Sequence, residues 1–434
     1  MVVGPYLRRG PGKGSARAED SERSPAARLD EAVGLARAID LEVVEAGIAP
    51  LASIRPATFL GKGKVEEIAG LTKSLDIELV VMDCALSPVQ QRNLERAWSA
   101  KVLDRTGLIL EIFGRRARTR EGTLQVEHAH LTYQKSRLVR SWTHLERQRG
   151  GFGFLGGPGE TQLEADRRMI EERLAKIERE LEGVKKTRKL HRDSRKRVPY
   201  PIAALVGYTN AGKSTLFNRL THATVLQADM LFATLDPTLR AITLPHGGKA
   251  ILSDTVGFIS ELPTMLVAAF RATLEEVIEA DVILHVRDAT HPDTAAQAHD
   301  VEEVLRALDI DPDDHGRLIE VWNKVDRLDA EARQQLENVA ERRPADERPV
   351  LVSALTGQGL DRLLEAIEAH LAQTRIVLDL VVDSADGAGV SWLHRHAEVM
   401  GTTLREDGQL AMTVRADPAN AERIRGKFIA PTLR

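Results

Sequence analysis

Apolar and polar residues alternate along residues 28–113 in a pattern that predicts helices and strands in turn. Helical spacing of the apolar positions predicts three helices, at 28–39, 64–75 and 88–100. Short apolar runs predict strands, at 41–44, at 79–82 and within 102–113. Because strands that alternate with helices usually pair in parallel, we expect a small α/β domain with a largely parallel sheet over residues 27–114.

A seven-residue repeat of apolar positions follows this domain and predicts two long helices. One series is Leu124, Leu131, Leu138 and Leu145, and the other is Leu163, Ile170, Ile177 and Val184. Helices with a heptad repeat pack along their apolar seam, and a short connection between them favours an antiparallel arrangement. We therefore predict a helical hairpin over residues 115–198.

The connector of this hairpin, residues 150–159, combines flexibility with apolar side chains. Six of its ten residues are glycine, yet Phe152, Phe154 and Leu155 are apolar. A loop at the end of a hairpin cannot easily bury such side chains within itself. They therefore predict a recognition tip that approaches the backbone of a partner or stacks on bases. The alternative is a hairpin turn that packs on a neighbouring domain.

Composition narrows the class of protein. The chain has 434 residues, of which 43% are hydrophobic and 29% charged, which is ordinary globular composition. Its single cysteine, Cys84, excludes an internal disulfide and a four-cysteine zinc site. No apolar run approaches the roughly 18 residues of a membrane span, so we expect a soluble cytoplasmic protein and leave peripheral membrane association open. Residues 1–26, rich in Gly, Pro, Ser, Arg and Glu, are predicted to be a disordered leader.

The net charge of −4 conceals two basic segments. Residues 115–149 carry nine Lys and Arg against three acids, a net charge of +6, and residues 183–198 carry eight against one, a net charge of +7. The rest of the chain therefore has a net charge of −17. Because the two segments lie on both sides of the hairpin, they favour contact with a phosphate backbone over a merely solvated face.

A phosphate-binding loop follows the apolar strand predicted at 202–206. It consists of Gly207, Tyr208, Thr209, Asn210, Ala211, Gly212, Lys213, Ser214 and Thr215. Glycines let backbone N–H groups turn towards phosphate oxygens, and the N-terminus of the following helix adds positive potential. We expect Lys213 to bind the β- and γ-phosphates and the Ser214 hydroxyl to ligate Mg²⁺.

Two later strand ends carry residues suited to selecting guanine. The first follows the strand at 318–322 and consists of Asn323, Lys324, Val325 and Asp326; the second follows 350–352 and consists of Ser353, Ala354 and Leu355. The Asp326 carboxylate can accept hydrogen bonds from two N–H groups of guanine, a donor pair that adenine lacks. We expect Asn323 to contact the base and the loop, Lys324 to cover the base, and a backbone N–H of the second segment to meet the guanine oxygen.

Two segments between the loop and the base site are predicted to sense the γ-phosphate. One ends the strand at 250–253 and consists of Asp254, Thr255, Val256 and Gly257; the other consists of Phe232, Ala233, Thr234 and Leu235. Asp254 would hold Mg²⁺ indirectly, Thr234 would be its second hydroxyl ligand, and the Gly257 N–H would meet the γ-phosphate. The chain is thus predicted to be a GTPase with Lys213, Thr234 and Gly257 as catalytic residues and with Ser214 and Thr234 as metal ligands.

Two residues depart from the pattern expected of such a site. Phe258 stands where many such enzymes have a glutamine that orients the attacking water, so we predict slow intrinsic hydrolysis that a partner or another residue completes. The alternative is that Phe258 only packs within the switch and that another residue of the chain positions the water. Arg287 occupies a position where an aliphatic residue is expected, unless it lies past the end of the strand predicted at 282–286.

Taken together, these residues resemble the HflX family of ribosome-associated GTPases. The resemblance covers residues 27–373 and is carried by Phe59–Lys64, Gly151–Glu164, Gly207–Asn218, Phe232–Thr238 and Asp254–Ile259. It implies a GTPase that uses GTP and Mg²⁺, binds the large ribosomal subunit and its ribosomal RNA, and splits or rescues stalled ribosomes, particularly under stress. It also implies that the glycine-rich tip lies near the peptidyl transferase centre, that the family lacks the water-positioning glutamine, and that ribosomes stimulate its hydrolysis.

The predicted fold class is a multidomain α/β protein built around a P-loop GTPase domain at 199–373. Residues 374–434 are expected to form the small C-terminal α+β domain that the family often carries, with strands at 377–382 and 410–414 around a helix at 390–399. We expect a monomer. Two other functions stay open, namely a nucleotide-dependent remodeller of free RNA and a GTP switch for a protein effector, as does the use of ATP at a second site.

Overall fold

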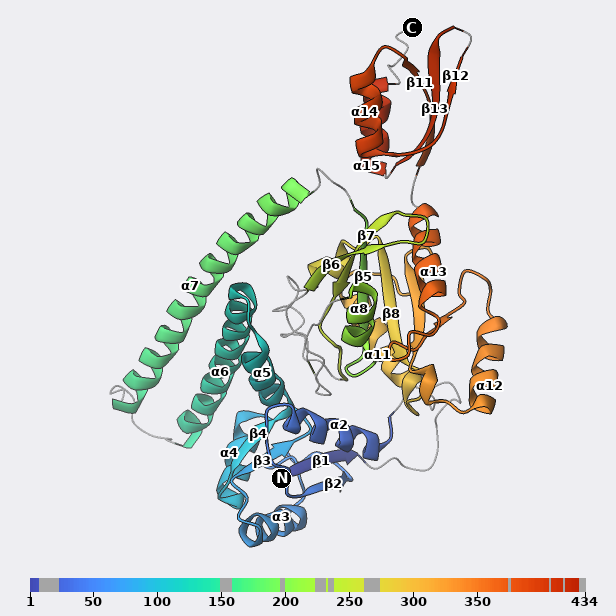
Figure 1. Ribbon diagram of the computed structural model, residues 1–434. Helices are drawn as coiled ribbons and strands as arrows, with labels where there is room; N and C mark the ends of the chain where they lie inside the picture. Colours follow the sequence, from blue (N-terminus) through green and yellow to red (C-terminus); the bar gives the residue numbers. More distant parts are fainter. Residues whose placement is uncertain are drawn as a thin grey trace.

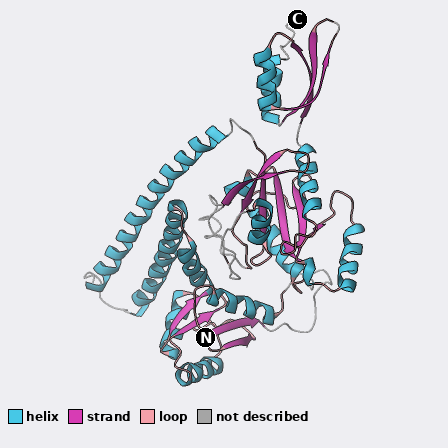
Figure 2. Cartoon of the chain, viewed as in Figure 1, coloured by secondary structure: helices cyan, strands magenta, loops and turns pink. Residues whose placement is uncertain are grey.

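The computed structural model describes most of the chain, namely residues 1–7, 23–148, 158–195, 200–222, 232, 238–260, 274–373, 376–405, 407–416 and 418–428. In Figure 1 the chain forms four parts: an N-terminal domain, a long helical hairpin, a central domain and a C-terminal domain. Figure 2 shows that each of the three domains contains a sheet, whereas the two described arms of the hairpin are helices. The predicted multidomain α/β architecture is confirmed.

The N-terminal domain is built on a four-stranded sheet with the order β2-β1-β3-β4, in which all neighbouring strands are parallel. Its elements are β1 (Val2–Leu7), α2 (Pro25–Arg37), β2 (Ala46–Leu51), α3 (Lys62–Ser74), β3 (Leu79–Met82), α4 (Pro88–Trp98), β4 (Lys101–Asp104) and α5 (Arg105–Arg116). The predicted alternation of helices and strands is therefore confirmed. Local capping explains two helix starts, since the Ser24 side chain caps α2 and Ser87 forms a capping box with Gln90 at the start of α4.

Two predictions in this domain are wrong, and a third holds for only the first part of its range. Residues 2–7 do not belong to a disordered leader, because they form the inner strand β1, whose residues Val2 and Val3 are almost fully buried. The strand expected at 41–44 lies instead at Ala46–Leu51, in parallel register with β1. The strand expected within 102–113 ends at Asp104, and helix α5 follows. Most residues of α5 are buried, and a helix without a polar face has the same apolar run as a buried strand.

The predicted antiparallel hairpin is confirmed by helices α6 (Arg120–Gln148) and α7 (Pro158–Arg195), which lie side by side in Figure 1. Leu124, Leu174 and Ile177 are buried, the last with no exposed surface. Charged pairs also join the helices; for example, Arg173 donates to both carboxylate oxygens of Glu127 at 2.7 and 2.9 Å, and Lys135 lies 3.0 Å from Glu171. The predicted tip lies mostly in residues 149–157, outside the described residues.

The buried carboxylate of Asp104 is one point at which helix α6 is attached to the N-terminal domain. Tyr133 donates a hydrogen bond to Asp104 Oδ1 at 2.5 Å, and Arg137 lies 2.6 Å from Oδ2. The same carboxylate caps helix α5 by accepting from the backbone N–H of Gly107. The middle of helix α6 is therefore fixed to the end of β4 and the start of α5.

The central domain contains a six-stranded sheet with the order β10-β9-β8-β5-β7-β6, parallel except for the edge strand β6. Its elements are β5 (Ile202–Gly207), α8 (Lys213–Thr221), β6 (Thr238–Thr243), β7 (Lys249–Asp254), α10 (Glu275–Ile278), β8 (Val282–Asp288), α11 (Thr294–Ala307), β9 (Leu318–Asn323), the 3₁₀ turn η1 (Val325–Arg327), α12 (Ala330–Glu341), β10 (Val350–Leu351) and α13 (Leu360–Gln373). Apolar residues of α8 and α13 pack on one face of the sheet, and those of α11 pack on the other. The helices cover the two faces of the sheet, so the carboxyl ends of the parallel strands are where a binding site is expected.

The N-terminal and central domains share one hydrophobic cluster. It contains Leu108 and Phe113 of helix α5 together with Val256, Phe258 and Ile259, which follow strand β7. The residues that follow strand β7 are therefore packed against a helix of another domain.

The C-terminal domain is a three-stranded antiparallel sheet with the order β11-β13-β12, accompanied by two helices. Its elements are β11 (Ile376–Asp383), α14 (Gly387–His396), β12 (Glu398–Leu404), β13 (Gln409–Ala416) and α15 (Pro418–Phe428). The predicted α+β character is confirmed, but the helix expected at 390–399 ends at His396, and Val399 lies in β12.

Candidate active site

The predicted phosphate loop joins the end of β5 to the start of α8, and two of its glycines are required by the geometry. Gly207 has φ of +150°, and a Cβ there would lie 2.2 Å from the carbonyl oxygen of Val286. Gly212 has φ of +95°, and a Cβ there would lie 2.2 Å from Nδ2 of Asn323. Since no side chain can be accommodated at either position, the loop packs directly on β8 and on the end of β9.

Lys213, the first residue of α8, is buried beneath this loop. Its Nζ donates hydrogen bonds to the carbonyl oxygens of Gly207 at 2.9 Å and Tyr208 at 2.7 Å. Burial lowers the pKa of the Lys213 ammonium to about 8, although Asp254 opposes this shift. The loop thus holds a buried cation where the sequence predicts phosphates to bind.

Only some of the predicted metal-binding residues belong to the described part of the chain, and those lie together. The Ser214 hydroxyl donates to Oδ2 of Asp254 at 2.7 Å, so two oxygen donors lie together beside the loop. Hydroxyl and carboxylate oxygens are the donors that Mg²⁺ prefers, and this pair fits such an ion. Ala233 and Thr234 lie outside the described residues, whereas Phe232 is buried and packs edge-on against Phe113 of α5, with ring centroids 4.7 Å apart.

The predicted base site is assembled from the ends of β9 and β10. Asn323 donates from Nδ2 to the carbonyl oxygen of Ala211 at 2.8 Å and accepts from the Ala354 N–H at 3.0 Å, so one side chain joins the phosphate loop to both base segments. The Ser353 hydroxyl donates to Oδ1 of the exposed Asp326 at 2.5 Å. Of the other residues in these two segments, Lys324 pairs with Asp288 at 2.6 Å, Val325 is buried and Leu355 is exposed.

The segment Asp254–Gly257 leads from β7 across the phosphate loop. Thr255 is fully buried and its hydroxyl donates to the carbonyl oxygen of Leu205 at 2.5 Å, while Val256 is nearly buried. The next residue, Phe258, accepts from the Thr209 N–H at 2.7 Å and donates to the Gly207 carbonyl oxygen at 3.1 Å. With only 1% of its surface exposed, the Phe258 side chain packs in the shared cluster and does not point towards solvent.

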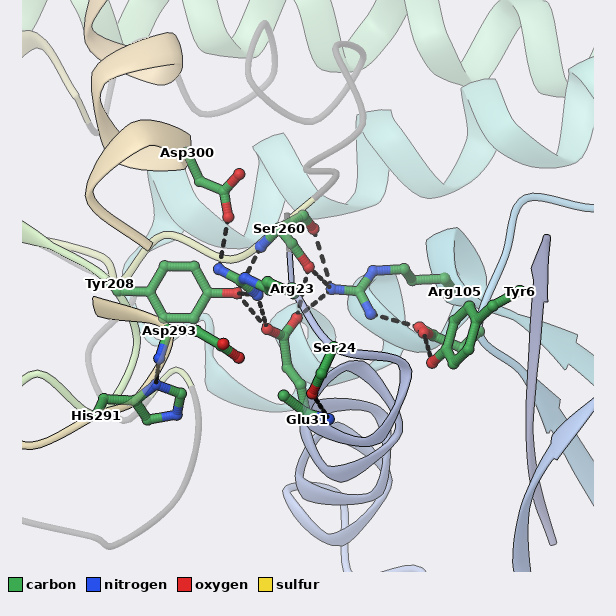
Figure 3. Close-up of polar contacts among 12 residues, drawn as sticks. Tyr6, Arg23, Ser24, Glu31, Arg105, Tyr208, Ser260, His291, Asp293 and Asp300 are labelled. Atoms are coloured by element: carbon green, nitrogen blue, oxygen red, sulfur yellow. Dashed lines mark hydrogen bonds and ion pairs between the residues drawn. The ribbon is translucent and has the colours of Figure 1, made fainter. Parts of the chain in front are cut away.

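Sequence reasoning missed a group of polar residues that joins this segment to the N-terminal domain (Figure 3). Ser260 donates from its backbone N–H to the phenol oxygen of Tyr208 at 2.7 Å and from its hydroxyl to Oε1 of Glu31 at 2.9 Å. Arg105 Nη2 donates to the carbonyl oxygen of Ser260 at 3.0 Å and to its hydroxyl at 2.9 Å. The only hint in the sequence is that Arg105 stands at the start of an otherwise apolar run.

Three charged residues surround the Glu31 end of this group. Glu31 pairs with Arg105 and with Arg23, and Arg23 also pairs with Asp300 of α11 at 2.5 Å. Burial opposes ionisation of Glu31, but the adjacent Arg105 and Arg23 outweigh it and hold the pKa of this carboxyl below its ordinary value. Burial, together with Glu31, raises the pKa of the Tyr208 phenol. Glu31 is therefore charged at neutral pH and Tyr208 is neutral.

Arg287 lies inside strand β8, which continues to Asp288, so the suggestion that it lies past the strand end is wrong. Its guanidinium pairs with Glu320 on the neighbouring strand β9 and lies 5.9 Å from the ring centroid of Trp322. Arg343 approaches the same carboxylate at 2.5 Å. Arg287 therefore belongs to a charged cluster with Glu320 and Arg343. It is not part of the phosphate loop, which follows the adjacent strand β5.

The phosphate loop, the end of β7 and the two base segments converge at the carboxyl ends of neighbouring strands, and with this fold they define a P-loop GTPase. Four family models match the chain: "GTP-binding GTPase N-terminal" over 26–114, "GTP-binding GTPase Middle Region" over 116–195, "50S ribosome-binding GTPase" over 202–324 and "HflX C-terminal domain" over 338–429.

Full-length relatives agree with these matches. The chain is 49% identical over 399 residues to GTPase HflX of Magnetococcus marinus, covering 92% of this chain and 90% of that protein. It is 46% identical over 360 residues to GTPase HflX of Escherichia coli, covering 83% of each. The chain belongs to the HflX family of GTPases, and it hydrolyses GTP.

Among solved structures, the chain aligns with a GTP-binding protein from the archaeon Sulfolobus solfataricus in complex with GDP, at 24% identity with a TM-score of 0.41, covering 86% of this chain and 99% of that one. None of the helices in the described residues has the length and apolarity that crossing a membrane requires.

Proposed function

We propose that this GTPase binds the large ribosomal subunit and splits or rescues stalled ribosomes. The observation that carries the proposal is the long basic hairpin α6–α7, whose helix α6 is fixed to the N-terminal domain through its middle (Figure 1). The model matched by residues 202–324 describes a 50S ribosome-binding GTPase, which supports the same partner.

The proposed residue roles follow the predicted site. Lys213 binds the β- and γ-phosphates, the Gly257 N–H meets the γ-phosphate, and Asp326 reads guanine. Ser214, Thr234 and, indirectly, Asp254 hold Mg²⁺, which neutralises charge on the phosphates when bound. The buried Phe258 cannot orient the attacking water, so the isolated protein hydrolyses GTP slowly and the ribosome completes the site.

The dimensions of the hairpin suit it to reach into a large partner. Helix α7 has 38 residues, which corresponds to about 57 Å at 1.5 Å per residue. Interhelical contacts at Ile177 and between Arg173 and Glu127 stiffen its middle. We infer that Phe152 and Phe154 of the connector meet RNA bases when the hairpin contacts this partner.

The basic segments supply the electrostatic part of this contact. Phosphate contacts release counterions, so binding through residues 115–149 and 183–198 weakens steeply as salt concentration rises. Part of the first segment is used internally, because Arg137 pairs with Asp104. The second segment has no such pair to the N-terminal domain among its described residues, and Lys186 in it is exposed.

Sedimentation with ribosomes tests the proposal. Purified protein is mixed with intact ribosomes and either GDP or a non-hydrolysable GTP analogue and then separated on a sucrose gradient. We expect protein on the large subunit in the triphosphate state, together with a loss of intact ribosomes. An unchanged ribosome profile without co-sedimentation rejects the proposal, and binding to protein-free RNA with nucleotide-dependent unwinding would favour the RNA remodeller instead.

A variant of the connector and a control variant test whether the connector contacts the ribosome. Replacing Phe152 and Phe154 by Ala should impair ribosome binding and splitting while nucleotide affinity of the free protein stays unchanged. The matched control replaces Met400 and Leu404, two exposed apolar residues of β12, and should leave both properties unchanged. Loss of nucleotide binding in the tip variant would show a structural role for the two phenylalanines instead.

A further inference from the structure

Ser260 lies three residues beyond Gly257 and is held by three side chains, which we call the Ser260 clamp: Glu31, Arg105 and Tyr208. Arg105 binds both the carbonyl and hydroxyl oxygens of Ser260, Glu31 accepts from its hydroxyl, and Tyr208 accepts from its N–H, all within 3.0 Å. As Figure 3 shows, the clamp joins helix α2, helix α5 and the phosphate loop around one residue. Every hydrogen-bonding group of Ser260 is therefore engaged.

The clamp is itself rigidly supported. Arg105 also pairs with Asp83 at 2.5 Å, and Asp83 accepts from the phenol of Tyr6 at 2.6 Å. The Arg105 and Glu31 side chains are only 5% and 10% exposed. Buried charges that are mutually paired are costly to separate, so Ser260 is anchored to the core of the N-terminal domain rather than to a mobile surface group.

The clamp holds the preceding residues directly on the phosphate loop. A Cβ built on Gly257 would lie 2.9 Å from Cγ2 of Thr209 and 3.1 Å from Nζ of Lys213, so Gly257 packs against the loop and its buried ammonium. The two backbone hydrogen bonds of Phe258 with Thr209 and Gly207 close the same contact. In P-loop GTPases the loop backbone cradles the α- and β-phosphates and the lysine reaches the γ-phosphate, so we expect a γ-phosphate on the side of Lys213 where Gly257 packs.

We propose that Glu31 is a positioning residue that sets the preference of this GTPase for GDP over GTP. Through Ser260 it holds the Gly257–Ser260 segment on the phosphate loop, so accommodation of the γ-phosphate requires the clamp to loosen. Because coupling between two sites is reciprocal, bound GTP in turn loosens the contact of the central domain with helices α2 and α5. Glu31 acts through Ser260 and does not itself touch the nucleotide.

The test measures equilibrium affinities of the full chain for GDP and for a non-hydrolysable GTP analogue, without ribosomes. Glu31→Gln removes the charge that holds Arg105 and weakens the contact with Ser260. Ser260→Ala removes the hydroxyl but leaves the ion pairs of Glu31 intact. The matched control is Asp30→Asn, which removes an exposed carboxylate from the adjacent position of α2.

We expect Glu31→Gln and Ser260→Ala to shift the affinity ratio towards the triphosphate by about fivefold or more, with no further shift when the two are combined. Asp30→Asn should leave the ratio unchanged. A merely structural role of Glu31 would weaken both nucleotides alike, and an unchanged ratio or a shift towards GDP in Ser260→Ala overturns the proposal. If Glu31→Gln fails to fold, Ser260→Ala decides. Since ribosomes are absent, the result is independent of the ribosome proposal.

Discussion

Asp104 and Arg105 are consecutive residues, yet their side chains bind different parts of the molecule. Asp104 accepts hydrogen bonds from Tyr133 and pairs with Arg137 on the hairpin, whereas Arg105 donates to Ser260 of the central domain. One peptide unit at the start of α5 thus connects the hairpin to the segment beside the phosphate loop.

The base site predicts a change of nucleotide specificity. Asp326→Asn replaces an acceptor by a donor at the edge that reads guanine, so GTP affinity should fall by about 100-fold and xanthosine triphosphate should bind better than GTP. Competition binding with the two nucleotides measures this. The control Asp346→Asn, an exposed acid elsewhere in the central domain, should leave the order unchanged. Equal GTP affinity of Asp326→Asn and the parent would show that Asp326 does not read the base.

The buried ammonium of Lys213 predicts that nucleotide binding depends on pH. Its pKa is lowered to about 8 in the free protein, and phosphates favour its charged form, so nucleotide binding takes up a proton above that pH. Affinity should therefore be constant near neutrality and fall as pH rises through about 8, approaching tenfold per pH unit. Titration calorimetry in buffers of different ionisation enthalpy measures both the affinity and the proton uptake.

The comparison variant Lys213→Arg keeps its charge throughout this range. It should bind more weakly than the parent, because its geometry differs, but without the alkaline decline. A decline of the same size in Lys213→Arg would assign the pH dependence to another group.

His285 predicts a loss of stability in mild acid. Burial in strand β8 lowers its pKa to about 4, with Glu320 opposing and Arg287 adding to this shift, whereas an unfolded histidine titrates near about 6.5. Between these values the unfolded state binds more protons, so the stability of the central domain should fall by about 3 kcal/mol as pH decreases from about 6.5 to about 4. Urea unfolding of the central domain across this range measures the slope. His285→Leu should reduce the slope, whereas substitution of the half-exposed His315 should preserve it.

The hairpin seam predicts a large difference between two residues of the same helix. Ile177→Ala removes a fully buried side chain from the contact of α7 with α6 and should destabilise the hairpin by about 3 kcal/mol. Met169→Ala removes a side chain that is 61% exposed and should cost less than about 0.5 kcal/mol. Amide hydrogen exchange along α6 and α7 reports both effects. Similar protection in the two variants would mean that the seam does not hold the hairpin together.

Local motifs could be read from the sequence because their chemistry depends on short spacing. The run from Gly207 to Ser214 places a lysine and a hydroxyl at the end of one strand, and Asn323 to Asp326 places a carboxylate at the end of another. The heptad spacing of Leu124, Leu131 and Leu138 similarly predicted the hairpin, since the period of the repeat sets the face that is buried. Whether these residues have the proposed roles stays a prediction.

Errors arose where packing against distant residues decides the local structure. The segment Val2–Leu7 is too short and its surroundings too polar to signal a strand, but pairing with β2 and β3 buries it in the middle of a sheet. Helix α5 has the apolar composition of a strand because the hairpin and the central domain cover the face that would otherwise be polar.

The sequence by itself therefore determined the GTPase motifs, the hairpin and the basic segments and predicted the guanine-reading residues, because each pattern depends on residues close in the chain. Only the tertiary structure decided that Glu31, Arg105 and Tyr208 meet at Ser260, since these residues are separated by up to 229 positions and no local pattern relates them. Buried charges must find partners wherever the fold places them. That requirement joins the N-terminal domain to the phosphate loop.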